Sequence, residues 1–503
     1  MKIKFTLVCL LMIILCSACR AGVDPAPLPT EGRVEAEYSE PTWGEPKSYA
    51  ANLTPGAQKA LEQFPGASEY HIQLEIPETL TLPFTGQLEV RYTNQETVPL
   101  EEIIFRLFAN YNGGAIIVTD VEVDQTPAVT SLETSDTTLA VQLPEPLEAG
   151  EAVTVSMGFS MSVPTEFGGN YGLLSYIDEI LVLDLFYPMI PAYDEFGWYR
   201  QYPSSAGDLT YNDIAFYQVQ VSAPENLVLV ASGSEVARQT SDGRQQVSFA
   251  AGPVRDFFLA GSSQFTLLSA EVGGVTLNSY ALPGNARHQQ YVLDHLQSGL
   301  VVFEDLFGAY PYTEFDVVSS PMQALGIEYP GIVGIFKDLY LEDNEKYGSF
   351  TTTLLETVVI HELAHQWFYG VVGNNQQALP WVDEAVTQYS VYLYGNQVWG
   401  EENAEGLIED WQRRMASLED SEQPLGMAVD EYGRDYSGII YGRGPYFFYQ
   451  LGMEIGEDVL IAGLADYYQS NMWGIGTTDS IQDSLEGACE CDLTVYFEEW
   501  VYP

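Results

Sequence analysis

The chain has 503 residues, of which 46% are hydrophobic and 13% aromatic, enough apolar material for two or three domains that each bury a core. Its 71 Asp and Glu residues outnumber 19 Lys and Arg and give a net charge of −52, which argues against a nucleic-acid-binding protein, because such proteins need a basic face. An acidic surface also keeps a protein soluble and attracts cations toward its clefts.

The N-terminus reads as a targeting segment. Lys2 and Lys4 precede an uncharged, mostly apolar run over residues 5–15, which is as long as the core of a signal peptide and shorter than the ~20 residues of a membrane span. Cys19 follows small residues, and the end of the segment resembles a bacterial lipobox, with Cys16 where Leu is usual. We therefore expect a signal peptide over 1–19 and a lipid on Cys19. The alternative is an ordinary signal peptide cleaved nearby, and both place the mature protein outside the cytoplasmic membrane, the first on its outer face.

Two regions of different character follow. Residues 20–66 are rich in proline and acidic residues and are predicted to form a tether. Residues 67–268 are predicted to form a β-rich domain, because apolar and polar residues alternate in runs such as 87–92 and 153–161. Many short strands separated by turns favour an antiparallel sandwich or saddle.

The periodicity changes in residues 269–503, which we expect to form a second, α+β domain with a helical C-terminal part. Apolar residues recur at helical spacing over 288–306, 352–369 and 381–394, the last opened by Pro380. Cys489 and Cys491 are spaced C-x-C without nearby histidines, so they form either a local disulfide or two free thiols.

The residues that carry chemistry are His361-Glu362-Leu363-Ala364-His365. Positions four apart lie on the same face of a helix, so the two imidazoles can bind one metal ion, with Glu362 placed to take a proton from a water molecule. The apolar turn before them, residues 357–360, is typical of a buried active-site helix. The alternative is a pair of helix histidines beside a surface glutamate.

A catalytic zinc ion needs three protein ligands and an open position for water. Glu384 is the candidate for the third ligand, because the eighteen residues after His365 are enough to end one helix and begin the next. Asp383 is the neighbouring alternative and points elsewhere on a helix.

This pattern resembles the gluzincins of the aminopeptidase N and leukotriene hydrolase family, whose signature is H-E-x-x-H, eighteen residues and Glu. The resemblance implies one zinc ion bound by His361, His365 and Glu384, with Glu362 as general base and then general acid. It also implies a saddle-shaped N-terminal domain followed by a thermolysin-like domain.

Two further motifs extend the resemblance. Gly326-Ile327-Glu328-Tyr329-Pro330 is similar to the exopeptidase motif GAMEN, with Tyr in place of Asn, which implies that Glu328 binds the free α-amine of a peptide and that Gly326 lines the same site. Tyr441-Gly442-Arg443-Gly444 is similar to Y-x-K-G, which implies that Tyr441 stabilises the oxyanion and that Arg443 takes the place of the lysine.

The expected function is therefore a zinc aminopeptidase that acts on peptides. The chain ends about 60 residues after Tyr441, before the large helical C-terminal domain of many relatives, so a more open cleft is expected. The alternatives are a zinc endopeptidase on the same site and a non-catalytic surface lipoprotein that uses the fold for binding.

Overall fold

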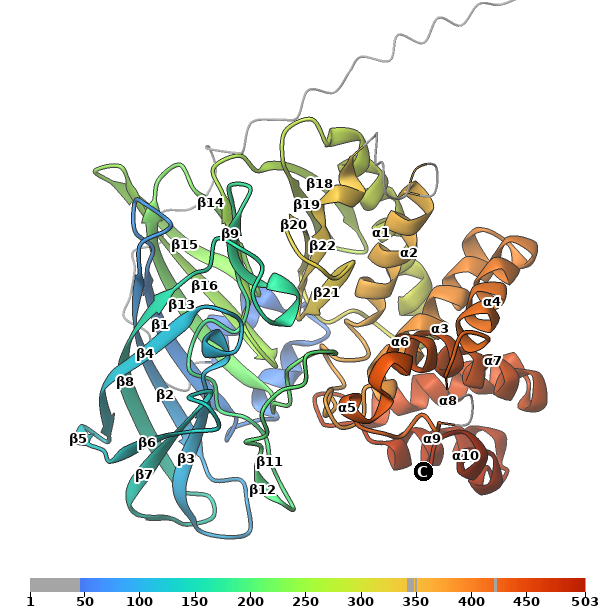
Figure 1. The fold of residues 1–503 in the computed structure, drawn as a ribbon, viewed down its shortest axis with the longest axis horizontal. Coiled ribbons are helices and arrows are strands. Elements are labelled where there is room, and N and C mark those ends of the chain that lie inside the picture. The colour runs from blue at the N-terminus through green and yellow to red at the C-terminus, as the bar shows by residue number, and fades with distance from the viewer. Residues whose placement is uncertain (1–45, 342–347, 349–350, 420–422, 503) are drawn as a thin grey trace, which may run out of the picture.

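A computed structural model describes residues 46–341, 348, 351–419 and 423–502. Strands dominate the N-terminal half and helices the C-terminal half (Figure 1), so the predicted α+β architecture with a β-rich domain first is confirmed. The signal peptide and lipobox expected over 1–19 lie outside the described residues. Among the described residues no helix is both long and apolar enough to cross a membrane.

The β-rich domain is built on an eight-stranded sheet whose neighbours are antiparallel except for the parallel pair β1 and β13. Its alternating sequence explains its one buried face: in β2, Leu88 and Val90 are buried while Gln87 and Glu89 are exposed. The strands in spatial order are β15 (Ser234–Ser241), β16 (Arg244–Val254), β13 (Ala215–Pro224), β1 (Ser68–Glu75), β2 (Phe84–Thr93), β8 (Ala152–Ser162), β4 (Ala115–Val123) and β5 (Thr126–Pro127).

Smaller sheets complete this domain. They are β14 (Val228–Ala231), β17 (Leu259–Ser262), β10 (Ile180–Leu183) and β9 (Leu174–Ile177); β3 (Leu100–Arg106), β7 (Thr138–Leu147) and β6 (Thr130–Glu133); and the hairpin of β11 (Tyr193–Asp194) and β12 (Gly197–Trp198).

The second domain begins with a five-stranded sheet of β18 (Thr266–Val272), β19 (Val275–Ala281), β20 (Glu314–Ser320), β22 (Ile332–Phe336) and β21 (Gly326–Tyr329), in this order. Sheet membership changes between β17 and β18, so the boundary placed after residue 268 falls inside β18. The strand β21 is the free edge of this sheet and contacts the zinc-motif helix α2.

The helices of this domain are α1 (Ala286–Phe307), α2 (Thr351–Ala364), α3 (Trp381–Val398), α4 (Glu401–Met415), α5 (Val429–Tyr432), α6 (Tyr436–Gly438), α7 (Gly444–Ile455), α8 (Glu457–Ser470), α9 (Thr478–Cys489) and α10 (Thr494–Trp500), with a π-helical turn over Ile439–Arg443.

Two sequence predictions of local structure were wrong. The helix expected over 352–369 ends at Ala364, because the amides of Gly370, Val371 and Val372 bond to carbonyls five residues back and the chain turns. Residues 46–66, assigned to the tether, contain two 3-10 helices, Pro46–Asn52 and Gln58–Glu62. Tyr49 and Leu53 are buried there, so scattered apolar residues outweigh the proline-rich composition.

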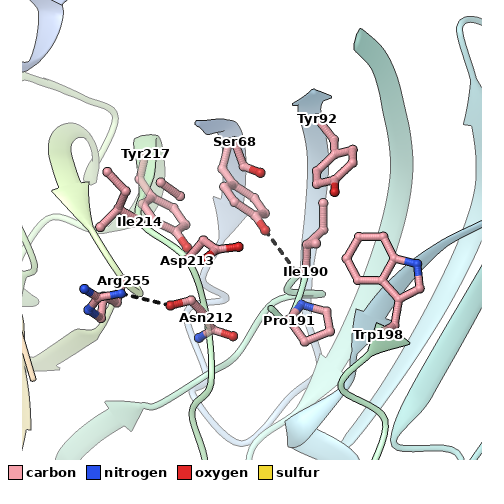
Figure 2. A pocket seen from close by; sticks show the side chains of 12 residues that line it. Ser68, Tyr92, Ile190, Pro191, Trp198, Asn212, Asp213, Ile214, Tyr217 and Arg255 are labelled. Carbon is pink, nitrogen blue, oxygen red and sulfur yellow. Dashed lines mark hydrogen bonds between the residues drawn. The ribbon is translucent and has the colours of Figure 1, made fainter. Parts of the chain in front are cut away.

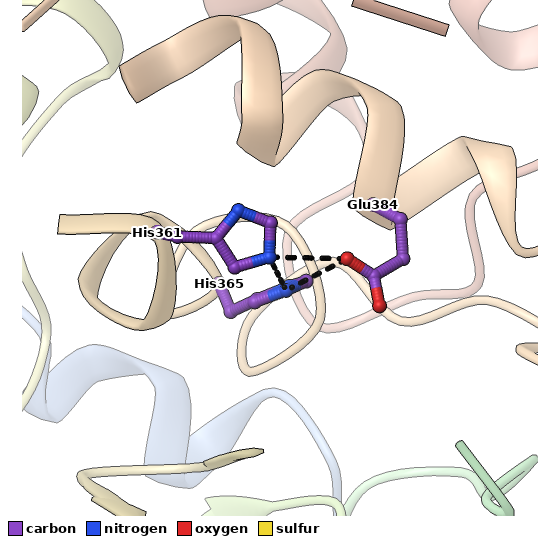
Figure 3. Close-up of side chains that lie close together, drawn as sticks. All are labelled: His361, His365 and Glu384. Atoms are coloured by element: carbon purple, nitrogen blue, oxygen red, sulfur yellow. Dashed lines mark hydrogen bonds and ion pairs between the residues drawn. The ribbon is translucent and has the colours of Figure 1, made fainter. Parts of the chain in front are cut away.

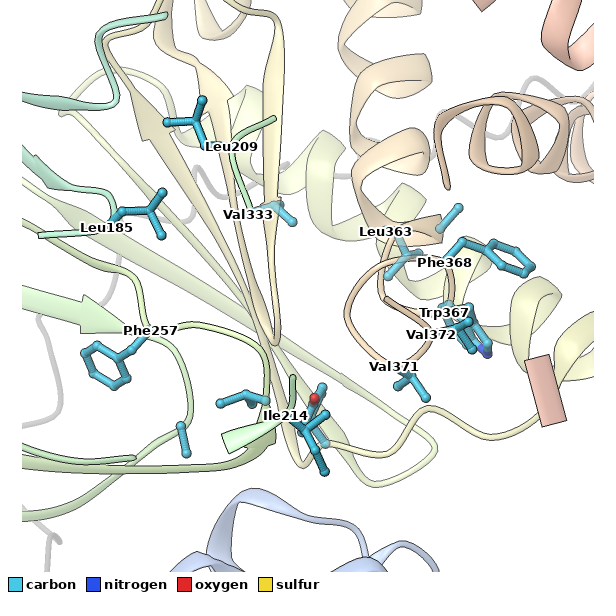
Figure 4. Close-up of a cluster of buried hydrophobic side chains, with 14 of the residues drawn as sticks. Leu185, Leu209, Ile214, Phe257, Val333, Leu363, Trp367, Phe368, Val371 and Val372 are labelled. Atoms are coloured by element: carbon cyan, nitrogen blue, oxygen red, sulfur yellow. The ribbon is translucent and has the colours of Figure 1, made fainter. Parts of the chain in front are cut away.

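One hydrophobic core runs through both domains and surrounds the zinc-motif helix (Figure 4). Leu185, Leu209, Ile214 and Phe257 come from the β-rich domain, and they belong to the same cluster as Val333, Leu363, Trp367, Phe368, Val371 and Val372. Because this core is continuous, the metal-binding segment is held against the β-rich domain.

A buried guanidinium also joins the two domains. Arg255 donates to the carbonyls of Asn212 in the β-rich domain and of Tyr369, Val371 and Gly474 in the second domain. Beside it lies a cavity of about 20 Å³, lined in part by Asp213 (Figure 2), which has room for one water molecule and not for a peptide.

Cys489 and Cys491 form a disulfide at the end of α9, which settles the two alternatives left open by their spacing.

Candidate active site

The three predicted metal ligands converge at the junction of α2 and α3 (Figure 3). His361 lies in the last turn of α2, His365 directly follows that helix, and Glu384 lies in the first turn of α3. Glu384 Oε2 is 3.1 Å from His361 Nε2 and 3.4 Å from His365 Nε2, and the two Nε2 atoms are 3.2 Å apart. Each of the three residues is at most 9% exposed.

These separations fit a zinc ion. With zinc bonds of about 2.0–2.1 Å and tetrahedral angles, two ligand atoms lie about 3.3 Å apart. The three observed separations bracket this value. Two nitrogens and one carboxylate oxygen are also the donor set of catalytic zinc sites, and three protein ligands leave a fourth position open.

The surroundings orient His365 toward this position. Its Nδ1 lies 3.0 Å from the Phe368 carbonyl, which can only accept, so Nδ1 carries a hydrogen and Nε2 is the nitrogen that faces the other two ligands. Burial favours the neutral imidazole, but the hydrogen bond and charge of Glu384 outweigh it and raise the pKa of His365 to about 10. The same histidines overcome the effect of burial on Glu384 and lower the pKa of that carboxyl. The pocket therefore has a carboxylate that favours a cation.

The predicted general base lies beside the ligands and against the edge strand. The backbone of Gly326 approaches Glu362 so closely that a Cβ on this glycine would lie 2.1 Å from Glu362 Oε1. Glu362 Oε2 is buried and has no hydrogen-bond partner among the described residues. Burial raises the pKa of Glu362 well above its ordinary value. A buried carboxylate with a free oxygen is suited to exchange a proton with a water molecule.

Glu328, the candidate for amine binding, is brought next to this base. One oxygen of Glu328, one of Glu362 and a ring nitrogen of His365 all lie within 4.8 Å of one another. Glu328 is 4% exposed and accepts a hydrogen bond of 2.8 Å from Gln376 Nε2. Burial, and then the charges of Asp208 and Glu384, raise the pKa of Glu328 well above its ordinary value. A cationic group is the natural partner for such a site.

Tyr441 also reaches the centre. Its hydroxyl donates to Glu384 Oε1 over 2.5 Å from the π-helical turn. Arg443 lies with its guanidinium 4.8 Å from the ring centre of Trp500 and donates to the Glu499 carbonyl on α10. The role of Arg443 in substrate binding stays a prediction.

The structure also shows where the unusual Tyr329 lies. Its ring is 4% exposed and stacks on Phe258 at 4.2 Å, so the side chain belongs to the core. The backbone around it is held by Gln366, which donates to the Tyr329 carbonyl and accepts from the amide of Gly331. The zinc-motif segment and the edge strand are thereby fixed to each other.

Sequence analysis missed two residues of this site. Asp208 comes from a loop of the β-rich domain whose carbonyl accepts from Gln377, and burial together with the charges of Glu384 and Asp383 raises the pKa of Asp208 well above its ordinary value. Gln376 follows the zinc motif in the run Asn374–Gln377, four consecutive amide side chains in an otherwise apolar stretch. This run of amide side chains could have indicated Gln376 as a functional residue, whereas no pattern in the sequence around Asp208 indicated that residue.

The segment that carries most of this site is similar to a domain of known proteins. Residues 291–500 match the peptidase family M1 domain. The second domain is therefore similar to the M1 peptidase domain. The resemblance to gluzincins inferred from the sequence is thus confirmed.

The proteins similar to this chain include aminopeptidases of several organisms. It is 24% identical to aminopeptidase 2 of Candida albicans over 56% of the chain and 32% of that protein. It is 23% identical to aminopeptidase N of Bos taurus over 83% of the chain and 45% of that protein. The chain spans less than half the length of either relative.

The fold has been seen before. The crystal structure of an M1 zinc metallopeptidase from Deinococcus radiodurans superimposes with a TM-score of 0.67 at 19% identity, covering 87% of this chain and 94% of that one. A structure of a mutant of that peptidase bound to a Tyr-Ser-Ala substrate has a TM-score of 0.63 at 19% identity, covering 87% of this chain and 95% of that one. The two-domain arrangement is therefore shared.

Proposed function

We propose that this M1 protein is a zinc aminopeptidase that removes residues from the free N-terminus of peptides, with one zinc ion held by His361, His365 and Glu384. The observation that carries the proposal is the placement of Glu328 within 4.8 Å of both the base Glu362 and the ligand His365. In a peptide, the nitrogen and the carbonyl carbon of one residue are about 2.5 Å apart. An ammonium held by Glu328 would therefore bring the first peptide bond to Glu362.

The chain's own groups account for the steps of hydrolysis. His361, His365 and Glu384 would hold the zinc ion, which would act as a Lewis acid and lower the pKa of a water molecule to about 7. Glu362 takes the proton of the attacking water molecule and returns it to the leaving amine, for which its buried, unpaired oxygen is suited. The Tyr441 hydroxyl, now on Glu384, turns to donate to the oxyanion.

Electrostatics favour the exopeptidase over the endopeptidase. Glu328, Asp208 and Asp383 lie near one another in the site, and each carboxyl disfavours the ionisation of the others. A free α-ammonium brings the positive charge that this cluster lacks, while an internal peptide bond brings none. The named relatives are aminopeptidases, and the structure with Tyr-Ser-Ala shows the Deinococcus radiodurans peptidase, as a mutant, with a tripeptide.

A pair of measurements tests the proposal. We expect the purified protein to contain one zinc ion per chain and to cleave a peptide with a free N-terminus much faster than its N-acetylated form. Glu362→Gln should keep the zinc and lose turnover by about 10²–10⁴-fold, because proton transfer is removed while the ligands remain. Equal cleavage of both peptides would favour an endopeptidase, and zinc without hydrolysis would favour a binding protein.

We further propose that the protein acts outside the cytoplasmic membrane, anchored by a lipid on Cys19. The lipobox-like end of the apolar segment supports this. Labelling cells with a radioactive fatty acid should mark the protein and leave Cys19→Ala unlabelled. A labelled Cys19→Ala variant, or a protein that remains in the cytoplasm, would contradict the anchor.

A further inference from the structure

A single buried amide connects the amine-binding carboxylate to the metal centre. Gln376 is 2% exposed and lies in the segment between the zinc motif and α3. Its Nε2 donates to Glu328 Oε1 over 2.8 Å and to Asp383 Oδ2 over 3.2 Å. Since the carboxylates accept, the amide nitrogen must face them, and both of its hydrogens are used.

The other side of the same amide is held by the β-rich domain. Gln376 Oε1 accepts a hydrogen bond from the hydroxyl of Thr210, which also lies 2.9 Å from the Tyr369 hydroxyl. Tyr369 in turn bonds to the buried Asp256. This series of hydrogen bonds therefore runs from Gln376 through Thr210 and Tyr369 to a buried carboxyl of the β-rich domain.

The connection to zinc runs through Asp383. Its Oδ1 accepts from the amide of Glu384 over 2.8 Å, so the carboxylate is fixed to the turn that carries the third ligand. Gln376 therefore spans from Glu328 on the edge strand to the start of α3. Without this amide, Glu328 would face the charges of Asp208, Glu384 and Asp383 with one side-chain donor fewer.

We propose that Gln376 is a positioning residue for Glu328, the carboxylate that binds the α-amine of the peptide. Gln376 fixes Glu328 at a set place relative to the metal centre, and Thr210 of the β-rich domain holds the Gln376 amide. This inference rests on the proposed aminopeptidase function. If Gln376 has this role, both domains help to decide which peptide bond lies at Glu362. Gln376 itself does not contact the reacting atoms.

The test compares Gln376→Leu, Glu328→Gln and the double variant with the wild type. For each, kcat/KM is measured on a peptide with a free N-terminus and on its N-acetylated form, and the affinity for L-arginine and for N-acetyl-L-arginine is measured by calorimetry. The matched control is Gln289→Leu, which removes another buried amide of the same domain, bonded to the Thr266 and Ser279 carbonyls.

We expect Gln376→Leu to lower the preference for the free peptide about tenfold, as the loss of a hydrogen bond to a charged group does, with zinc content unchanged. The double variant should be no worse than Glu328→Gln alone, because both changes act through one group. Gln289→Leu should lower stability and leave the preference as it is. Thr210→Val, a milder change, should reduce the preference about threefold by loosening the amide.

An unchanged preference in folded Gln376→Leu, or in Thr210→Val if the first variant does not fold, would overturn the inference. So would effects of Gln376→Leu and Glu328→Gln that simply add. A wild type that shows no preference for the free peptide would instead refute the proposed function, and the inference with it. The two failures are therefore distinct.

Discussion

The substitution Gly326→Ala tests the placement of the base with one methyl group. The new Cβ would lie 2.1 Å from Glu362 Oε1, whereas Cβ contacts under 3.0 Å are essentially never found, so the carboxylate has to retreat by about 0.9 Å. The backbone of Gly326 is not in the left-handed region, and the three atoms that the new Cβ would meet, Oε1, Cδ and Cγ, all belong to the side chain of Glu362. Folding should therefore be little affected. A displacement of about 1 Å in a catalytic group costs about 10²-fold in rate, or about 2.7 kcal/mol of transition-state stabilisation.

The assay is kcat/KM on an aminoacyl reporter, with zinc content and thermal stability measured on the same samples. Gly406→Ala is the control, because a Cβ there meets nothing within 4 Å. Gly326→Ala combined with Glu362→Gln should be no slower than Glu362→Gln alone. Full activity in Gly326→Ala would refute the reasoning, and so would a loss of activity that only follows loss of zinc or unfolding.

Three other predictions follow from the same geometry. Tyr441→Phe should lower kcat by about 10²–10³-fold with zinc retained, and an unchanged kcat would show that the hydroxyl does not reach the oxyanion. Zinc has to displace the proton of His365, whose pKa is about 10, so the apparent Kd for zinc should fall about tenfold for each unit of pH from 6 to 8; a chelator competition that finds no pH dependence would contradict this. Arg255→Met should lower the free energy of unfolding by about 3–5 kcal/mol in urea titrations, because four buried carbonyls lose their charged donor; a loss under 1 kcal/mol would show that the domains are held by the apolar core alone.

Much of the fold followed from local pattern. Alternation in β2 and β8 predicted strands with one buried face, and both strands have it. The end of the zinc-motif helix was misjudged, because the aromatic residues Trp367, Phe368 and Tyr369 continue the hydrophobic pattern after the backbone has left the helix. Apolar residues indicate that a segment is buried but not which backbone structure it has, and this segment is buried as a turn instead of a helix.

The prediction for residues 46–66 was wrong in the opposite direction, because it expected no regular structure where the chain is folded. Proline-rich composition predicted a tether, yet the amide of Thr54 bonds to the Pro311 carbonyl and Leu53 pairs with Tyr312 in the second domain. Contacts across more than 250 residues leave no local periodicity, so composition alone could not indicate them.

The candidate metal ligands and the candidate base could be predicted from the sequence, and the structure brings the ligands together. His361, Glu362 and His365 lie within two turns of one segment, where helical geometry sets the direction of each side chain, and Glu384 follows on the next helix. What holds Glu328 in place could be seen only in the folded chain. Glu328 and Gln376 are 48 residues apart, so their hydrogen bond forms only when the second domain has folded, whereas Thr210 and Gln376 are 166 apart and bond only once the two domains have packed. Side-chain direction within a helix is a local property, whereas a buried polar contact between domains depends on the packing of the whole chain.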